Sequence, residues 1–358
     1  MATGDVILVT RLGKSWYKKR NRDSRLTDLE LRIYNALHSD RTIQFMGIEI
    51  PEIQMEDGAL LVRNAGTTFA AVLNSSAYRS LADEKVLYRI IQVRAAVNTV
   101  VNRTLTDEDK VYLAATQRTA LVQSAQKINP TVTEQDVARH YWAYRMMNAL
   151  GIFDEQFKDN YTEVIGKRID ALLSKYGSWC TDNYVRNNVV CSDGSIIPFD
   201  FNSIRFGLRQ FDDATIAGLY VFAGPLAVNA SPEKRLETMR KLQEVHGLLA
   251  DDDYLPAFLL SCIHANGIIA GYRTRDIKKA GPGDNPLDFA YSFEEIETYQ
   301  TTAVMPIREF GHALVKTDDE LEKLSHIASV ITHYTFGQRL LTLMGRTAPP
   351  RAREYVLA

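Results

Sequence analysis

The sequence predicts an α+β protein of two lobes, in which a small β-rich N-terminal lobe precedes a large and mainly helical lobe. Residues 6–10 and 15–19 are short runs of strand-forming residues on either side of a turn at residues 12–14, which is the pattern of a hairpin. Further along the chain, apolar residues recur mainly at helical spacing. With 358 residues and 46% hydrophobic content, the chain is long enough to bury a large core.

A helix is predicted directly after the hairpin, because Leu26, Leu29, Ile33 and Leu37 fall on one helical face. The helical patterns of the remaining chain cover residues 86–101, 132–150, 164–173, 233–249, 255–265 and 320–343. The predicted helix at residues 164–173 stops at Gly177 and leads into the most informative part of the sequence.

Composition limits the classes of partner. The net charge is only -2, so nucleic acid is not the expected partner. The three cysteines have no paired spacing, which favours a reducing compartment, and no long apolar run predicts a signal peptide or a membrane span. We therefore expect a cytoplasmic protein that does not enter a membrane.

A candidate site lies in the middle of the chain, where Asp182 and Asn187 come before a predicted hairpin and Asp200 comes after it. Asp193 and Gly194 are the expected two-residue turn of this hairpin. Such a turn sets Asn187 directly opposite Asp200, with their Cβ atoms about 5 Å apart. An amide oxygen and a carboxylate at that distance can share one hard cation. Asp182 would lie at the same end and could accept a proton from a hydroxyl.

The order Asp182-x4-Asn187, hairpin, Asp200-Phe201 resembles the catalytic and metal-binding loops of the protein-kinase-like superfamily, in particular its aminoglycoside phosphotransferase and choline kinase branch. The branch usually has His-Gly before the first aspartate, whereas this chain has Cys180-Thr181. It also usually has a glutamate after Asp-Phe, whereas this chain has Asn202.

The resemblance extends to the residues that follow. Asp212-Asp213-Ala214 is similar to the Asp-x-Ala that opens the next helix in these enzymes. There the aspartate supports the catalytic loop, so the resemblance implies this supporting role for Asp212.

The resemblance also implies roles for the N-terminal part. A strand lysine, Lys18 or Lys19, would hold the nucleotide phosphates and pair with Glu30 on the following helix. The two lysines point to opposite faces of the strand, and the spacing from the turn favours Lys18. Residues 58–66 resemble the last strand of the small lobe running into the hinge, where the backbone of Asn64 and Ala65 would contact adenine.

The division of the chain that this resemblance implies is a small lobe at residues 1–63, a hinge at residues 64–66 and a helical lobe at residues 67–358. The expected activity is transfer of a phosphoryl group from ATP or GTP to the hydroxyl of a small molecule such as an aminoglycoside, choline or a sugar. Asn187 and Asp200 would hold Mg²⁺, and Asp182 would orient the acceptor hydroxyl and take its proton.

Two alternatives remain open. The resemblance includes a first strand and a glycine-containing phosphate loop, yet only Gly4 precedes the predicted hairpin. A pseudokinase, which binds nucleotide or other proteins without turnover, is therefore the main competitor. Transfer of another group, such as a nucleotidyl moiety, would use the same metal ligands.

Other polar clusters give weaker predictions. The acidic residues at 251–253 and at 294–297 could line a site for a cationic acceptor, although exposed acidic turns are the more usual explanation. His312, His326 and His333 do not have the spacing of a zinc pair on one helical face. Cys180 has no histidine near it in the sequence that would support a thiol nucleophile.

Overall fold

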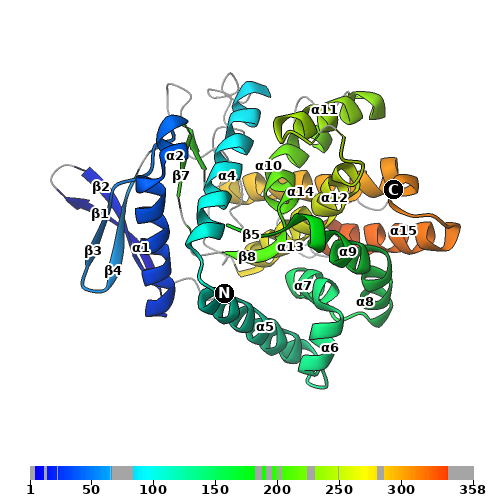
Figure 1. Ribbon diagram of the computed structural model, residues 1–358. Helices are drawn as coiled ribbons and strands as arrows, with labels where there is room; N and C mark the ends of the chain where they lie inside the picture. Colours follow the sequence, from blue (N-terminus) through cyan, green and yellow to red (C-terminus); the bar gives the residue numbers. More distant parts are fainter. Residues whose placement is uncertain are drawn as a thin grey trace. The chain divides into compact units, whose positions relative to one another are not determined.

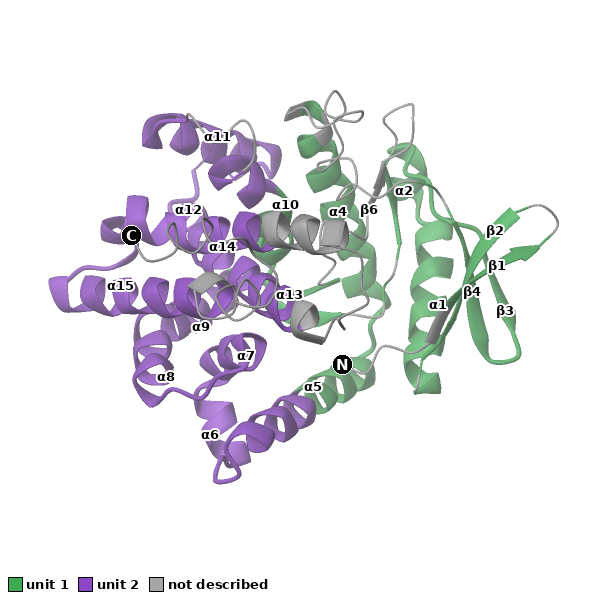
Figure 2. Cartoon of the chain, turned by 180° about the vertical axis from the view of Figure 1, so that it is seen from behind, with its two compact units in different colours: residues 1–117, 176–216 green, residues 118–175, 217–358 purple. Residues whose placement is uncertain are grey.

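The computed structural model describes most of the chain. The described residues are 5–11, 14–21, 23–64, 66, 84–181, 188–190, 196–199, 201, 204–223, 230–248, 250–279 and 286–337. They fall into two compact units, which Figure 2 shows in different colours. Unit 1 contains Met1–Gln117 and Tyr176–Ile216, and unit 2 contains Arg118–Lys175 and Ala217–Ala358. The predicted lobes at residues 1–63 and 67–358 divide the chain at other positions and stay a prediction.

Unit 1 begins with a four-stranded antiparallel sheet. Its strands are β1 (Asp5–Arg11), β2 (Lys14–Arg20), β3 (Ile53–Glu56) and β4 (Ala59–Arg63), in the order β1-β2-β4-β3. The predicted hairpin is therefore confirmed as β1 and β2. β3 and β4 are joined by Asp57 and Gly58, both with positive φ (50° and 70°), which is the geometry that a two-residue hairpin turn needs.

The predicted first helix is confirmed as α1 (Ser24–Ser39), which lies along this sheet (Figure 1). The Asp23 side chain caps its N-terminus by accepting a hydrogen bond from the N–H of Arg25. Its buried residues are Thr27, Leu29, Glu30, Ile33, Tyr34 and Leu37. Glu30 is the charged residue among them, so this apolar face carries one carboxylate into the interior. The short helix α2 (Arg41–Phe45) follows.

The rest of unit 1 is built around α4 (Glu84–Thr104), which continues the predicted helix at residues 86–101. α5 (Asp107–Ile128) and α10 (Gln210–Phe222) each contribute residues to both units. Two antiparallel pairs complete the unit: β5 (Gly177–Cys180) with β8 (Arg205–Leu208), and β6 (Asn188–Val190) with β7 (Ile196–Pro198). The sequence analysis did not predict α5 or the β5–β8 pair.

The β6–β7 pair confirms the predicted hairpin but not its register. Asn188 pairs with Pro198, and Val190 pairs with Ile196. A two-residue turn at Asp193 and Gly194 requires a register shifted by one residue, so that part of the prediction was wrong. Asp193 and Gly194 themselves lie outside the described residues, so the corrected register is that of the described pairs alone.

Unit 2 is helical in its described residues. Its helices are α6 (Glu134–Arg139), α7 (Tyr141–Leu150), α8 (Glu155–Tyr161), α9 (Lys167–Tyr176), α11 (Pro232–Val245), α12 (Tyr254–Ser261), α13 (Gly267–Lys279), α14 (Pro286–Leu314) and α15 (Asp318–Thr332). Three π-helical turns join or extend them: η2 (Thr162–Gly166), η4 (Cys262–Asn266) and η5 (His333–Gly337). The predicted fold class, a small β-rich N-terminal part and a mainly helical remainder, is confirmed.

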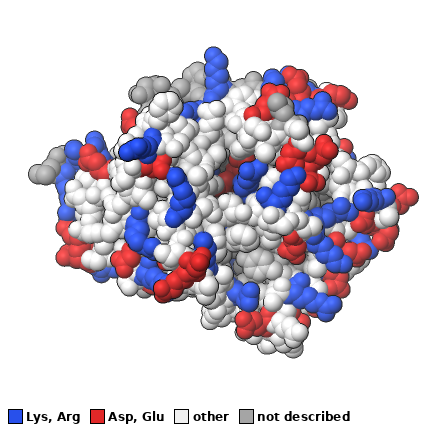
Figure 3. All heavy atoms as spheres, in the orientation of Figure 1, with Lys and Arg blue, Asp and Glu red and all other residues white. Residues whose placement is uncertain are grey.

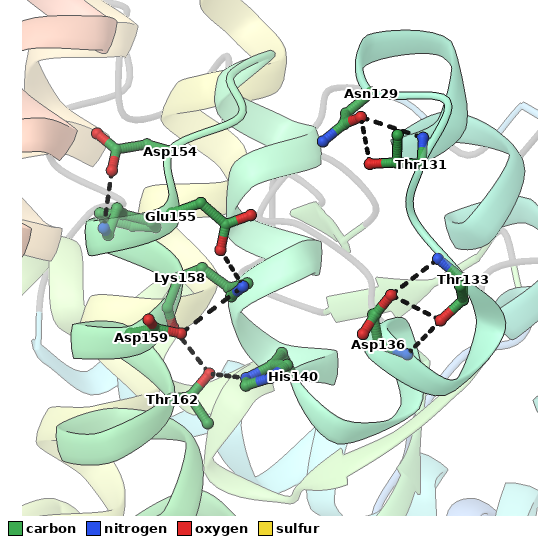
Figure 4. A network of polar contacts seen from close by, with 11 residues as sticks. Asn129, Thr131, Thr133, Asp136, His140, Asp154, Glu155, Lys158, Asp159 and Thr162 are labelled. Carbon is green, nitrogen blue, oxygen red and sulfur yellow. Dashed lines mark hydrogen bonds and ion pairs between the residues drawn. The ribbon is translucent and has the colours of Figure 1, made fainter.

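The predicted helix at residues 132–150 is divided into α6 and α7 at His140, whose φ of -120° and ψ of 37° are not helical. Figure 4 shows the polar contacts around this junction. Thr133 and Asp136 form a reciprocal capping box at the start of α6. His140 Nδ1 lies 3.0 Å from Thr162 Oγ1, and Lys158 pairs with Glu155.

α7 and α13 are closely packed in unit 2. A Cβ atom at Gly271 would lie 2.7 Å from the carbonyl carbon of Ala149, so the contact requires glycine at this position.

The segment Tyr254–Arg275, which includes α12, η4 and most of α13, is long and apolar enough to cross a membrane by length and composition. However, 83% of its most apolar window is buried inside the protein, as expected of a core helix. On the face shown in Figure 3, charges of both signs are interspersed.

Candidate active site

The first group of candidate residues meets inside unit 1, where Glu30 contacts two other segments. Its Oε1 atom accepts a hydrogen bond from Lys19 Nζ at 3.0 Å and another from the backbone N–H of Phe201 at 3.1 Å. Lys19, Glu30 and Phe201 are all buried. The Phe201 ring packs edge-on against Tyr34, with 4.9 Å between the ring centroids. Strand β2, helix α1 and the residue directly after Asp200 are thereby joined.

The structure corrects the preference for Lys18. Lys18 Nζ contacts Glu56 Oε2 on β3 at 2.8 Å, whereas Lys19 reaches Glu30. The reason is that neighbouring side chains of a strand point to opposite faces, and the side chain of Lys19 is the one directed to α1. Arg11 is also bonded to Glu56. The hydrogen bonds from Arg11 and Lys18 lower the pKa of Glu56 to about 2.

A second buried cluster surrounds Asp212 in the first turn of α10. Arg94 Nη2 lies 3.0 Å from Asp212 Oδ1, and Asn98 Nδ2 donates to Asp212 Oδ2 at 2.7 Å. Arg94 and Asp212 are 3% and 2% exposed, so each charge needs the other as its counter-charge. Arg94 and Asn98 come from α4, and the pair therefore joins α4 to the start of α10.

The same helix holds the strand that leads to Asp182. Arg94 Nη2 donates to Thr181 Oγ1 at 3.1 Å. Asn102 binds both backbone groups of Trp179: its Oδ1 accepts from the N–H at 3.0 Å, and its Nδ2 donates to the carbonyl at 2.9 Å. Asp212 is thus connected through Arg94 to the residue directly before Asp182, and its supporting role for the catalytic loop stays a prediction.

The sequence analysis missed three of these residues, Arg94, Asn98 and Asn102. A signal was present, because the three polar residues recur every four positions and so form one polar stripe on a helix that also carries a buried apolar face. Such a stripe commonly marks a solvated face, and only the tertiary structure shows that this one faces β5 and α10.

Asn64, one of the two predicted adenine contacts, already has backbone and side-chain partners. Its N–H donates to the carbonyl of Ser15 at 2.9 Å, and its Oδ1 accepts from the N–H of Gly66 at 3.1 Å. A contact between Asn64 and adenine would therefore use its carbonyl group. Ala65 lies outside the described residues.

The predicted base and metal ligands, Asp182, Asn187 and Asp200, also lie outside the described residues, as do Asp193 and Gly194. Within the part of the chain that the structure describes, no group of three or more histidine, cysteine, aspartate or glutamate side chains is arranged to hold a metal ion. The metal site at Asn187 and Asp200 stays a prediction.

The weaker candidates of the sequence have other contacts. Asp251 and Asp253 both pair with Lys175, at 2.5 and 2.8 Å, so a lysine of the chain already meets this acidic run. Cys180 and Cys262 are buried, and Cys180 Sγ contacts the carbonyl groups of Ser178 and Leu208.

No family model matches the sequence, and no curated protein matches it. Solved structures that are similar include a choline/ethanolamine kinase family protein from Mesorhizobium loti, with 11% identity, a TM-score of 0.42, and coverage of 91% of this chain and 93% of that chain. A spectinomycin phosphotransferase in complex with AMP has 14% identity and a TM-score of 0.42, with 82% and 90% of the two chains covered. An amicoumacin kinase in complex with AMP-PNP and Ca²⁺ has 12% identity and a TM-score of 0.41, with 82% and 88% covered. These proteins include both kinds of enzyme named in the resemblance above.

Proposed function

We propose that the chain transfers a phosphoryl group from ATP or GTP to the hydroxyl of a small molecule in a magnesium-dependent reaction. The observation that carries this proposal is the position of Glu30, which binds Lys19 and the backbone of Phe201 through one oxygen atom. A buried carboxylate holds the lysine ammonium in a defined direction, from which it could bind a further anion. A phosphate group of the nucleotide would be that anion.

The residues next to Phe201 and Thr181 would supply the chemistry. Asp182 would accept a hydrogen bond from the acceptor hydroxyl and take its proton as the new bond to phosphorus forms. Phosphoryl transfer depends mainly on positioning and on neutralising charge, so fixed attachment of the neighbouring residues is the main requirement on the protein. The contacts of Glu30 with Phe201 and of Arg94 with Thr181 meet this requirement.

The donor set proposed for the metal fits magnesium. Asn187 and Asp200 offer an amide oxygen and a carboxylate, which are hard ligands of the kind that Mg²⁺ takes in nucleotide sites. When bound, the ion would neutralise charge on the phosphate oxygens. The acceptor we propose is a small hydroxyl compound such as an aminoglycoside, choline or a sugar, as the resemblance implies.

A protein that binds nucleotide without turnover is the second candidate. Cys180 and Thr181 replace the His-Gly of the resemblance, and both are buried, with Thr181 accepting a hydrogen bond from Arg94. This change in the two residues directly before the proposed base, Asp182, favours a protein that binds nucleotide without turnover.

Two measurements distinguish these functions. Thermal unfolding with ATP or GTP, with and without Mg²⁺, should show a magnesium-dependent rise in the midpoint for either candidate. Transfer of labelled γ-phosphate to a panel of aminoglycosides, choline and sugars should then occur only for the enzyme. Absence of any nucleotide-dependent shift at saturating concentration contradicts the enzyme and favours a pseudokinase that binds other proteins without turnover.

A further inference from the structure

Unit 2 contains a buried arginine, Arg145, in the middle of α7. Three described arginines are buried: Arg94, Arg145 and Arg235, which are 3%, 8% and 7% exposed. Arg94 is paired with Asp212 at 3.0 Å, and Arg235 with Glu309 at 3.2 Å. Arg145 differs from both, because it forms no ion pair with any residue in the described ranges, and its Nη1 atom is buried without a hydrogen-bond partner.

This charge cannot be removed by loss of a proton. The guanidinium stays protonated at any pH at which the protein is folded, so its burial needs a counter-charge or hydrogen-bond acceptors. The contacts it does make are to aromatic rings, with Cζ lying 5.8 Å from the ring centroid of Tyr141 and 5.7 Å from that of Trp142. Cation–π contacts at this distance are weak and supply no hydrogen-bond acceptor for Nη1.

The surroundings of Arg145 are also polar. Tyr161 on α8 and His264 in η4 are both buried, and the Tyr161 hydroxyl lies 2.7 Å from His264 Nδ1. Trp142 packs edge-on against His264, with 5.1 Å between the centroids. Burial raises the pKa of Tyr161, and the charge of Arg145 acts in the opposite direction.

We propose that Arg145 is the centre of a binding site for a small oxyanion, a carboxylate or a phosphate group. The planar fork of N–H donors on arginine matches both groups and binds them through two parallel hydrogen bonds. The rings of Tyr141 and Trp142 give the site an apolar wall, which suits an anion carried on a compact organic molecule. This site belongs to unit 2 and does not depend on the proposed phosphotransferase activity.

Titration of the full chain with inorganic phosphate and with acetate tests the proposal, in the absence of nucleotide and magnesium and at an ionic strength held constant with sodium chloride. We expect a saturable rise in the unfolding midpoint of the wild type with at least one of the two anions. Arg145→Gln should lose this rise. Arg139→Gln is the matched control, because it removes the same charge from an exposed position on the neighbouring helix α6 and should keep the rise.

The variant Lys19→Ala separates this site from the proposed nucleotide site, which could also bind phosphate. A rise that is lost in Lys19→Ala and kept in Arg145→Gln overturns the proposal, as does a wild type that responds to neither anion. If Arg145→Gln does not fold, Arg145→Lys keeps the charge but not the fork of donors. That variant must then bind the anion more weakly than the wild type in calorimetric titration, and equal affinity overturns the proposal.

Discussion

Glu30 and Lys19 form a buried ion pair, 3.0 Å from Glu30 Oε1 to Lys19 Nζ, and the same oxygen accepts the backbone N–H of Phe201. Lys19 lies 11 residues from Glu30 in the sequence, and Phe201 lies 171 residues from it. The position of the carboxylate between these two donors is therefore set by the fold and not by the local sequence. The arrangement also makes Lys19, and not its neighbour, the lysine that is positioned toward α1.

The two lysines of β2 should differ in nucleotide binding. Because a hydrogen bond to a charged group contributes roughly 1.5–3 kcal/mol, Lys19→Ala should weaken magnesium-dependent ATP binding by roughly 10- to 100-fold. Lys18→Ala removes the same group from the contact with Glu56 and should leave the dissociation constant within about 2-fold. Calorimetric titration of both variants checks this, and an equal loss in the two would contradict the assignment.

Loss of the Glu30 carboxylate should destabilise unit 1. Glu30→Ala removes the buried carboxylate that pairs with Lys19 and accepts the N–H of Phe201, and breaking a buried pair in this way costs about 3–5 kcal/mol. Urea unfolding followed by circular dichroism measures the change. Glu56→Ala, at the partly exposed pair with Lys18, is the control and should change the free energy of unfolding far less. Similar effects of the two substitutions would argue against a special role for the buried pair.

The Arg94–Asp212 pair should be coupled energetically and should support catalysis. Asp212→Leu alone leaves Arg94 uncompensated and should cost about 3–5 kcal/mol, whereas Arg94→Met with Asp212→Leu should cost less than the sum of the single changes by about 1–3 kcal/mol. If the proposed function holds, Arg94→Met should lower kcat more than it weakens nucleotide binding, because Arg94 contacts Thr181, the residue directly before Asp182. Additive single effects would show that the two charges act independently.

Asp182 and Asp200 should affect different steps of the proposed reaction. Asp182→Asn should abolish phosphoryl transfer but spare nucleotide affinity, since a positioned base acts on the acceptor hydroxyl. Asp200→Ala should instead remove the magnesium dependence of nucleotide binding while the fold is kept. Nucleotide binding that falls equally in both variants would be evidence against separate roles.

His140 should make stability depend on pH. Burial, and then the charge of Lys158, lower its pKa from the ordinary value of 6.5, so the unfolded chain takes up a proton at a higher pH than the folded protein. The free energy of unfolding should therefore fall as the pH drops below about 6.5 and stop falling once folded His140 is also protonated.

His140→Gln should flatten this part of the pH profile of the free energy of unfolding. His312→Gln, at an exposed histidine of α14, is the control for loss of one histidine. Unfolding midpoints measured from pH 7.5 downwards would contradict the prediction if His140→Gln kept the slope of the wild type.

The sequence by itself determined the local elements. Short runs of strand-forming residues on either side of a turn were sufficient for the β1–β2 hairpin, and four apolar residues at helical spacing were sufficient for α1. The order of the motif residues Asp182, Asp200 and Asp212 could also be recognised from the sequence, because the motif is defined by spacing along the chain.

Only the tertiary structure decided which side chains meet. It selected Lys19 over Lys18, set the register of β6 with β7, and brought Arg94 and Asn98 of α4 to Asp212. These choices depend on which face of a strand or helix is directed to a distant segment. A shift of one residue turns a side chain to the opposite face of a strand, or by about 100° around a helix, without changing the local pattern. The partner of a buried charge is therefore a property of the packed fold, in which the free-energy cost of an unpaired charge rules out the other arrangements.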